Sequence, residues 1–222
     1  MYPRLDYNIE TDLVPLILVA SVPQVVVVNP KNVPGADFKA FLAQVKANPG
    51  KLNYGSGGNG RPQHNGMALG AERAPVDLMH GPYRGATPAA VAVAAGEVEA
   101  AMQGLGTVTS LIQGGKLRLL AVSTSERLAQ YPNVPTIVQA GISDFFFNSW
   151  FAMIAPAGTP KPIIDKLNAE MQKALTDPQT RERLIGLGVT IRGTSAAEFQ
   201  QATEKQYALY GKLIKDNKIQ AD

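Results

Sequence analysis

The glycine-rich stretch at residues 51–64 constrains the fold of this chain more than any other part of the sequence. A short apolar strand is expected to end at Tyr54, four glycines and two small polar residues follow, and Pro62 stands where a helix can begin. Such a turn leaves backbone N–H groups unpaired, and these groups and the helix dipole both favour negative charge. The stretch therefore predicts a site for a carboxylate or phosphate of a small ligand. The alternative is that the glycines only form a tight turn between strand and helix.

Composition limits the classes of protein to consider. The chain has 222 residues, 45% hydrophobic and 18% charged, which is enough for one large or two small globular domains. The net charge is +3 and the basic residues are scattered, so we expect no nucleic-acid partner. The absence of cysteine excludes disulfides and thiolate metal sites.

We expect neither a membrane-spanning segment nor a leader in this sequence. Its longest apolar run, around residues 25–28, is far too short to cross a bilayer. Met1 is followed by Tyr2, Pro3 and Arg4, not by a charged and then apolar leader, so we expect no signal peptide in this sequence. A cytosolic protein and a mature or trimmed chain both fit this observation.

Strands and helices are expected to alternate along the first two thirds of the chain. Phe38, Phe41, Leu42 and Val45 follow helical spacing, which predicts a helix over 37–48. This alternation indicates an α/β fold with a parallel or mixed sheet. Besides the strand that ends at Tyr54, strands are expected at 13–20, 24–29, 76–80, 98–102, 117–122 and 150–155. Further helices are expected at 62–73 and 89–95, the latter starting at Thr87-Pro88, and three more are expected from Thr159-Pro160, Asp177-Pro178 and Ser195.

A nucleotide site is the main alternative for the glycine-rich stretch. Residues 55–60 match G-x-G-x-x-G after a strand, which keeps a nucleotide-dependent enzyme open as the alternative function. Three features disfavour it. The following helix is short and contains Gly66 and Gly70, no acidic residue follows the second strand because Asp77 begins it, and the unit lies deep in the chain. The stretch also lacks the Lys-Ser/Thr ending of a nucleotide P-loop.

No catalytic or metal-binding set can be recognised. His64 and His80 are the two histidines, and neither has a cysteine or carboxylate at metal-ligand spacing. Ser56 lacks the first glycine of a nucleophile elbow because Tyr54 stands there. We therefore expect a binding protein and not an enzyme, with no catalytic residues, metal or cofactor.

Two arginines stand where α/β sheets place their ligands. Arg61 and Arg84 each follow a turn directly after an expected strand. An arginine at such a place can pair bidentately with a carboxylate. The alternative is that both are solvated loop residues.

Several motifs, in order along the whole chain, carry a family resemblance. They are ANPGKLNYGSGGNG at 47–60 followed by His64, PYRG at 82–85, GKLRLLAV at 115–122, PNVPT at 132–136, SWF at 149–151 and APAGTP at 155–160. With these motifs the chain resembles the Bug family, the periplasmic solute-binding receptors of tripartite tricarboxylate transporters.

The resemblance implies a two-lobed, type II periplasmic-binding-protein fold (a Venus flytrap) that holds a small carboxylate. Implied ligands are di- or tricarboxylates, amino acids or aromatic acids, the implied partners are membrane transporter subunits, and the implied compartment is the periplasm. In the family the stretch matching 55–64 presents backbone and hydroxyl groups to the carboxylate, and the PYRG turn lies near the ligand. Together with the residue argument, this gives the expected ligand-binding set Ser56, Gly57, Gly58, Asn59, Gly60, Arg61, His64, Tyr83 and Arg84.

The sequence also departs from the family pattern. Arg61 stands where the family usually has Ser or Thr, Asn65 where it has an apolar residue, and Gln103-Gly104 where many members have an acidic residue. Arg61 either adds a charge for the ligand or closes the site to the usual ligands.

A larger departure lies at the front of the chain. Family members carry a further half-domain before the point matching Tyr2, with a second carboxylate-binding loop of P-x-x-P-G-G type. We therefore expect one ligand-binding lobe at 22–146 and an incomplete second lobe from 1–21 plus 147–222. Such a lobe would expose apolar surface at 150–154 and favour self-association. A fragment without ligand-binding activity is the third interpretation.

Overall fold

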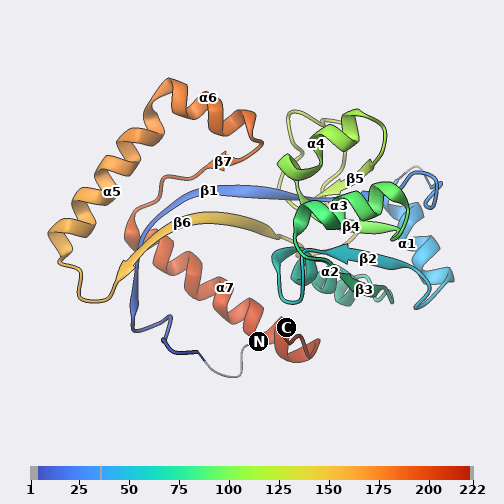
Figure 1. The fold of residues 1–222 in the computed structure, drawn as a ribbon, viewed down its shortest axis with the longest axis horizontal. Coiled ribbons are helices and arrows are strands. Elements are labelled where there is room, and N and C mark those ends of the chain that lie inside the picture. Colours follow the sequence, from blue (N-terminus) through green and yellow to red (C-terminus); the bar gives the residue numbers. More distant parts are fainter. Residues whose placement is uncertain (1–4, 36, 221–222) are drawn as a thin grey trace. The chain divides into compact units, whose positions relative to one another are not determined.

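The computed structural model describes residues 5–35 and 37–220, and residues 1–4, 36 and 221–222 lie outside the described part. The chain divides into two compact units, described separately below (Figure 1). The small unit comprises Met1–Val22 and Ser149–Lys212, and the large unit comprises Pro23–Asn148 and Leu213–Asp222. That these units serve as a ligand-binding lobe and a partial second lobe stays a prediction.

The C-terminal segment differs from the expected ranges. Residues 213–222 were assigned from sequence to the partial second lobe, whereas Leu213–Asp222 group with the large unit. The side chain of Asn217 donates a hydrogen bond to the Glu72 carboxylate (3.1 Å), which ties this segment to a helix of the large unit. A contact between residues so far apart in sequence leaves no local pattern, so sequence reasoning had no signal for it.

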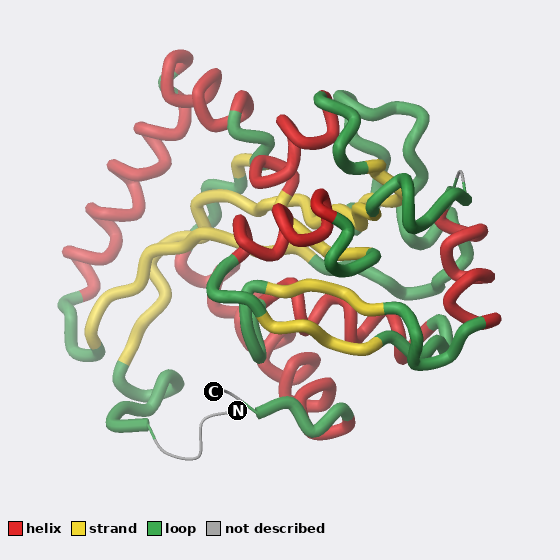
Figure 2. The backbone as a smooth tube through the Cα atoms, turned by 45° about the vertical axis from the view of Figure 1, so that its right-hand side comes forward, coloured by secondary structure: helices red, strands yellow, loops and turns green. Residues whose placement is uncertain are grey.

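The large unit contains a mixed sheet in which most strands run the same way. The strand order is β3-β2-β4-β1-β5. β2 pairs in parallel with β3 and with β4, whereas β1 pairs antiparallel with β4 and β5. The short strands β2 and β3 are seen side by side in Figure 2. The strands are β1 (Leu13–Val28), β2 (Asn53–Ser56), β3 (Met79–Pro82), β4 (Ala100–Gly104) and β5 (Arg118–Val122). The expected α/β class is therefore confirmed.

Two pairs of helices cover the sheet. α3 (Ala86–Ala95) and α4 (Leu105–Gln113) share a buried cluster with Val25, Val27 and Ala101. α1 (Phe38–Ala47) and α2 (Pro62–Arg73) lie with the alternate strand residues Val26 and Met102. Because successive strand side chains point to opposite faces, each pair of helices covers its own face.

Strand β1 is longer than the sequence predicts. Two strands, at 13–20 and 24–29, were expected with an interruption at Ser21-Val22-Pro23, but Leu13–Val28 is one strand. Proline cannot donate to a ladder, and Pro23 lies between two paired segments: Ala20 and Ser21 pair with β7 (Thr190–Ile191), and pairing with β4 begins at Gln24. The pairing thus passes from β7 to β4 on either side of the proline, and the strand continues through it. The apolar run at 25–28 is its buried end, and among the described residues no helix is long and apolar enough to cross a membrane.

Helix α4 was missed, and the boundaries of other elements shifted. Residues 107–113 were expected only to join two strands, whereas Leu105–Gln113 form a helix although its glycine and β-branched residues have low helix propensity. Leu105 and Val108 are buried in the cluster with α3, so packing forms this helix. β3 lies two to three residues later than expected, and α3 begins at Ala86 after Gly85, so Thr87 is not its N-cap.

The small unit is built from the first part of β1 and three helices. Its core contains Leu16, Ile17, Ala155, Ile164 and Leu175. Four apolar side chains of β6 are exposed, as expected for 150–154: Trp150, Phe151, Met153 and Ile154. The remaining elements are β6 (Asn148–Pro156), β7, α5 (Lys161–Thr176), α6 (Pro178–Gly186) and α7 (Ala196–Asp216), whose last residues belong to the large unit.

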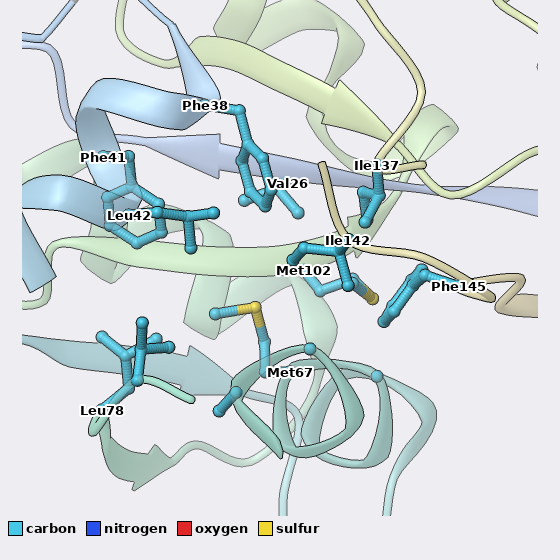
Figure 3. Close-up of a pocket in the computed structure, with 14 residues that line it drawn as sticks. Val26, Phe38, Phe41, Leu42, Met67, Leu78, Met102, Ile137, Ile142 and Phe145 are labelled. Carbon is cyan, nitrogen blue, oxygen red and sulfur yellow. The ribbon is translucent and has the colours of Figure 1, made fainter. Parts of the chain in front are cut away.

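A narrow apolar gap remains between α1, α2 and the sheet of the large unit. Met67, Met102, Ile142 and Phe145 point into it (Figure 3). Its volume is about 20 Å³, and its walls are almost entirely apolar. A gap of this size and lining is a packing space of the core and has no room for an organic ligand.

Two glycines of α2 that face this core give a paired test. A Cβ at Gly66 would collide with the sulfur of Met102 and lie 3.0 Å from the Phe147 ring, whereas a Cβ at Gly70 would meet Phe145 at an ordinary 3.6 Å. Gly66→Ala should lower the free energy of unfolding by about 1–3 kcal/mol through overpacking. Gly70→Ala should leave it unchanged or raise it by up to about 1 kcal/mol through helix propensity.

Urea unfolding followed by circular dichroism measures both variants. Equal effects of the two substitutions would contradict the close packing of α2 on β4.

Candidate functional site

Three helices of the large unit begin at the same edge of the sheet. β2, β3 and β4 are adjacent and parallel, so their carboxyl ends lie together. Each of the three leads directly into a helix: β2 into α2, β3 into α3 and β4 into α4. The carboxyl edge of parallel strands is where α/β sheets bind their ligands. We call this place the strand edge.

The helices at the strand edge have no side-chain caps. The N-cap positions of α2, α3 and α4 are Arg61, Gly85 and Gly104, and none of these residues forms a capping side-chain hydrogen bond. The first N–H groups of a helix have no partner inside it and carry partial positive charge. The strand edge therefore gathers three sets of N–H donors suited to an anion.

Other helices of the chain cap themselves. The side chain of Asp37 accepts from Ala40 N–H at α1, and Asp177 accepts from Thr180 N–H at α6. Ser195 caps α7 in a reciprocal arrangement with Glu198. Besides the three at the strand edge, α5, which follows Pro160 in the small unit, also lacks a capping side chain. Of the four helices in the described part of the chain that start without a capping side chain, three start at the strand edge.

Ser56 supports the loop from inside. It is fully buried, and its Oγ accepts from Gly58 N–H (3.1 Å) and hydrogen-bonds His80 Nε2 (2.6 Å). Its carbonyl oxygen accepts from Tyr83 N–H (2.9 Å). The hydroxyl that was expected to meet a ligand is thus engaged within the protein.

Gly57 and Gly58 bring the loop against the start of α3. A Cβ at Gly57 would lie 3.0 Å from the backbone nitrogen of Ala86, and Gly58 has a φ of +125°. Side chains are excluded from the first position by contact and disfavoured at the second by conformation. The glycines therefore hold two of the three helix starts close together.

His64 and Asn65 fix the end of the loop. Gly60 N–H donates to His64 Nδ1 (3.1 Å), and Asn65 Nδ2 donates to the Gly60 carbonyl (3.1 Å). His64 also stacks on His80, with ring centroids 3.8 Å apart and planes 21° apart. Burial lowers the pKa of His64 below its usual value. The neutral ring that Nδ1 needs to accept a hydrogen bond is therefore favoured.

The two arginines of the expected set are exposed beside the loop and the adjacent turn. Neither Arg61 nor Arg84 forms a salt bridge within the described part of the chain. Arg61 occupies the N-cap position of α2, and Arg84 immediately precedes the N-cap glycine of α3. Both charges are available to an anion at the strand edge.

Tyr83 and Asn59 complete the placement of the expected residues. The Tyr83 hydroxyl donates to the Glu97 carboxylate (3.5 Å), and burial followed by the Glu97 charge raises the pKa of this tyrosine. Its hydroxyl is thus directed to Glu97, beyond the end of α3. Asn59 lies half-buried in the turn that begins with Gly57.

Sequence reasoning missed three components of the strand edge. His80 was left out of the expected set, although parallel pairing of β2 with β3 places it opposite Tyr54. The start of α4 was missed with the helix itself. Gln103, at the end of β4, is fully buried, and its Nε2 and Oε1 have no hydrogen-bond partner in the structure. One feature of the sequence pointed to Gln103: this neutral residue stands where many family members have an acidic one.

Comparison with protein families decides what kind of protein this is. The family described as "Tripartite tricarboxylate transporter family receptor" matches residues 1–219. The chain belongs to this receptor family. The resemblance to Bug proteins is thereby confirmed, and the family is one of receptors rather than enzymes.

Two curated relatives are longer than this chain. A "UPF0065 protein in tcbD-tcbE intergenic region" of Pseudomonas sp. (strain P51) is 35% identical over 222 residues, which are 100% of this chain and 66% of that protein. Protein BugT of Bordetella pertussis (strain Tohama I / ATCC BAA-589 / NCTC 13251) is 34% identical over 190 residues, 86% of this chain and 58% of that protein. The chain thus spans about three fifths to two thirds of these relatives.

Solved structures share the receptor's fold. "R. palustris Rpa4515 with adipate" matches with a TM-score of 0.89 and 29% identity, over 99% of this chain and 73% of that one. The periplasmic binding protein BugD matches with a TM-score of 0.86 and 28% identity, over 100% of this chain and 75% of that one. "MatC (Rpa3494) from Rhodopseudomonas palustris with bound malate" matches with a TM-score of 0.84 and 27% identity, over 96% of this chain and 73% of that one. The expected periplasmic-binding-protein fold is confirmed.

The buried hydroxyl of Ser56 gives a test of the site's internal support. Ser56→Ala removes the partner of His80 Nε2 and of Gly58 N–H, so the free energy of unfolding should fall by about 1–3 kcal/mol. Ser110→Ala, at an exposed position of α4, is the matched control and should change it by less than about 0.5 kcal/mol. Urea unfolding measures both, and a Ser56→Ala effect no larger than the control's would show that the hydroxyl does not support the loop.

Proposed function

We propose that this receptor captures a small carboxylate at the strand edge and delivers it to a tripartite tricarboxylate transporter. One observation carries the proposal. Three adjacent parallel strands lead into three helices that have no side-chain caps, and beside this edge lie two exposed arginines that form no salt bridge with the described residues. A ligand carboxylate would act as the missing cap.

The chemistry of a carboxylate matches this arrangement. Each of its two oxygens accepts hydrogen bonds, and backbone N–H groups at the start of α2 and α3 are donors that need no deprotonation or rearrangement. A charged acceptor at a helix start gains about 0.3–1 kcal/mol from the dipole, and hydrogen bonds to charged groups contribute about 1.5–3 kcal/mol each. A few such contacts suffice for micromolar affinity.

Individual residues of the expected set take different roles. Backbone N–H groups of Gly57 and Asn59 would meet the ligand, and Arg61 and Arg84 would supply charge. Gly58 would shape the loop, since its N–H is bonded to Ser56 Oγ. Gly60 and His64 would hold the end of the loop, since the Gly60 N–H is bonded to the His64 ring. Ser56 would act as a support and not as a contact, because its hydroxyl is buried and hydrogen-bonded. Tyr83 would position the turn before α3.

The relatives support this ligand class. The solved structures with adipate and with malate are both complexes of dicarboxylates, in proteins of 29% and 27% identity to this chain. A dicarboxylate presents two anionic groups, which suits a site with two arginines. Function in the periplasm with membrane transporter subunits follows from the family and is part of the proposal.

Isothermal titration of the purified chain with adipate, malate and a panel of mono- and tricarboxylates tests the function. Arg61→Ala and Arg84→Ala should each weaken the affinity for the bound carboxylate about 10- to 100-fold, the loss expected for one charged hydrogen-bonding partner. Arg183→Ala, at an exposed position of α6, removes the same charge elsewhere and should leave the affinity within about twofold.

Two results would overturn the proposal. One is binding of NAD, NADP or ATP with no binding of any carboxylate, which would favour a nucleotide site. The other is a carboxylate affinity that is unchanged in both Arg61→Ala and Arg84→Ala, which would place the site elsewhere.

A further inference from the structure

Both histidines of the chain support the glycine-rich loop, one at each end. His80 Nε2 is hydrogen-bonded to Ser56 Oγ (2.6 Å), where the loop begins. His64 Nδ1 accepts the N–H of Gly60 (3.1 Å), where the loop ends. The two rings stack with centroids 3.8 Å apart. We call these two side chains the imidazole pair.

The contact to Gly60 depends on the protonation state of His64. Nδ1 accepts a hydrogen bond only when it carries no proton, and an imidazolium has donors at both nitrogens. A proton on Nδ1 would therefore set two N–H groups against each other at the end of the loop. Two protonated rings at 3.8 Å would also repel each other. The loop geometry thus requires a neutral His64.

We propose that the imidazole pair is a proton-sensitive support of the loop: neutral His64 holds Gly60 in place, and protonation releases the loop and weakens carboxylate binding. The first step, release of the loop when His64 is protonated, concerns only residues of this chain. The second step rests on the proposed function. His64 and His80 are in this account positioning residues, which act on a ligand through the loop.

Several groups around His64 decide how readily it takes up a proton. His64 is the third residue of α2, whose positive end disfavours an imidazolium. From β2, the ring of Tyr54 approaches it at 6.3 Å and stacks on His80 at 5.0 Å. Burial raises the pKa of Tyr54, so this neighbour stays uncharged. These neighbours add no negative charge that would favour protonation.

Carboxylates face His64 from one side. A pocket of about 310 Å³ beside it is also lined by Glu72 of α2, by Asp77 before β3 and by Asn217 after α7. These two carboxylates favour the protonated ring. Both residues are exposed, so water screens their charges. Burial is the dominant influence, and it holds the pKa of His64 below its usual value.

The direction of the pH effect follows. The unfolded chain binds a proton at His64 below about pH 6.5, whereas the folded chain, with its lowered pKa, does not. The neutral form and its bond to Gly60 are fully present above this pH. Stability and loop order decline as the pH falls below about 6.5 towards the folded-state pKa of His64.

Nuclear magnetic resonance of the full chain tests the first step. With two histidines in the sequence, a spectrum of ¹⁵N-labelled imidazoles is assigned by one variant, His80→Gln. We expect His64 to titrate below pH 6.5 and the Gly60 amide signal to move with the same midpoint. The proposal is overturned if His64 titrates at or above 6.5, or if the Gly60 signal does not follow it.

His64→Asn separates protonation from packing. The asparagine side-chain oxygen stands near the position of Nδ1 and accepts a hydrogen bond, but it does not titrate in this range. The Gly60 signal should then be independent of pH between 7.5 and 5.0. A Gly60 transition that persists in His64→Asn would assign the pH effect to another group.

Adipate affinity measured at pH 7.5 and 5.5 tests the second step. Between these values the affinity for adipate should fall about fivefold more in the wild type than in His64→Asn. A fivefold effect lies at the low end of the coupling known between two sites of one protein. Protonation of adipate itself is common to both proteins and cancels in the comparison. An equal loss in both proteins would overturn the second step while leaving carboxylate binding intact. If adipate binds at no pH although Gly60 follows His64, the support stands and the proposed ligand fails.

Discussion

The parallel pairing of β2 with β3 and β4 is the constraint on which the proposed site depends. It sets three carboxyl strand ends side by side, so the starts of α2, α3 and α4 gather at one edge. Elsewhere in the chain, Asp37, Asp177 and Ser195 cap helix starts with their side chains. At the strand edge the N-cap residues are Arg61, Gly85 and Gly104, and none of them forms a capping side-chain hydrogen bond. Backbone polarity that is unpaired in this way suits an anionic ligand and costs the fold little while water can reach it.

A second group of contacts keeps that edge in shape. The Ser56 hydroxyl, the stacked rings of His64 and His80, and the close approach of Gly57 to Ala86 together hold the loop before α2 against the start of α3. Preorganised donors bind more strongly than donors that must first be ordered. The internal polar bonds of the loop therefore contribute to affinity even where the side chains involved never touch a ligand.

Much of this could be predicted from sequence, because the signals are local. Helical spacing at Phe38, Phe41 and Val45 predicted α1, and the glycine-rich stretch after Tyr54 predicted a strand, a turn and a helix. The rest depends on contacts distant in sequence. α4 exists because Leu105 and Val108 are buried, in spite of its poor helix propensity. β1 passes through Pro23 because its partners change there. Ser56 was expected to face a ligand, and only its pairing with His80 of the neighbouring strand shows that it faces inward.

The central claim is that the strand edge of the large unit receives the carboxylate. The most direct measurement is a ¹H–¹⁵N correlation spectrum of the full chain titrated with adipate, with backbone amides assigned. The account predicts that the largest shifts fall on the amides of residues 57–61, of Gln63, of residues 84–86 and of Leu105, at the three uncapped helix starts. Saturating shifts confined to other parts of the chain, with these amides unmoved, would contradict it.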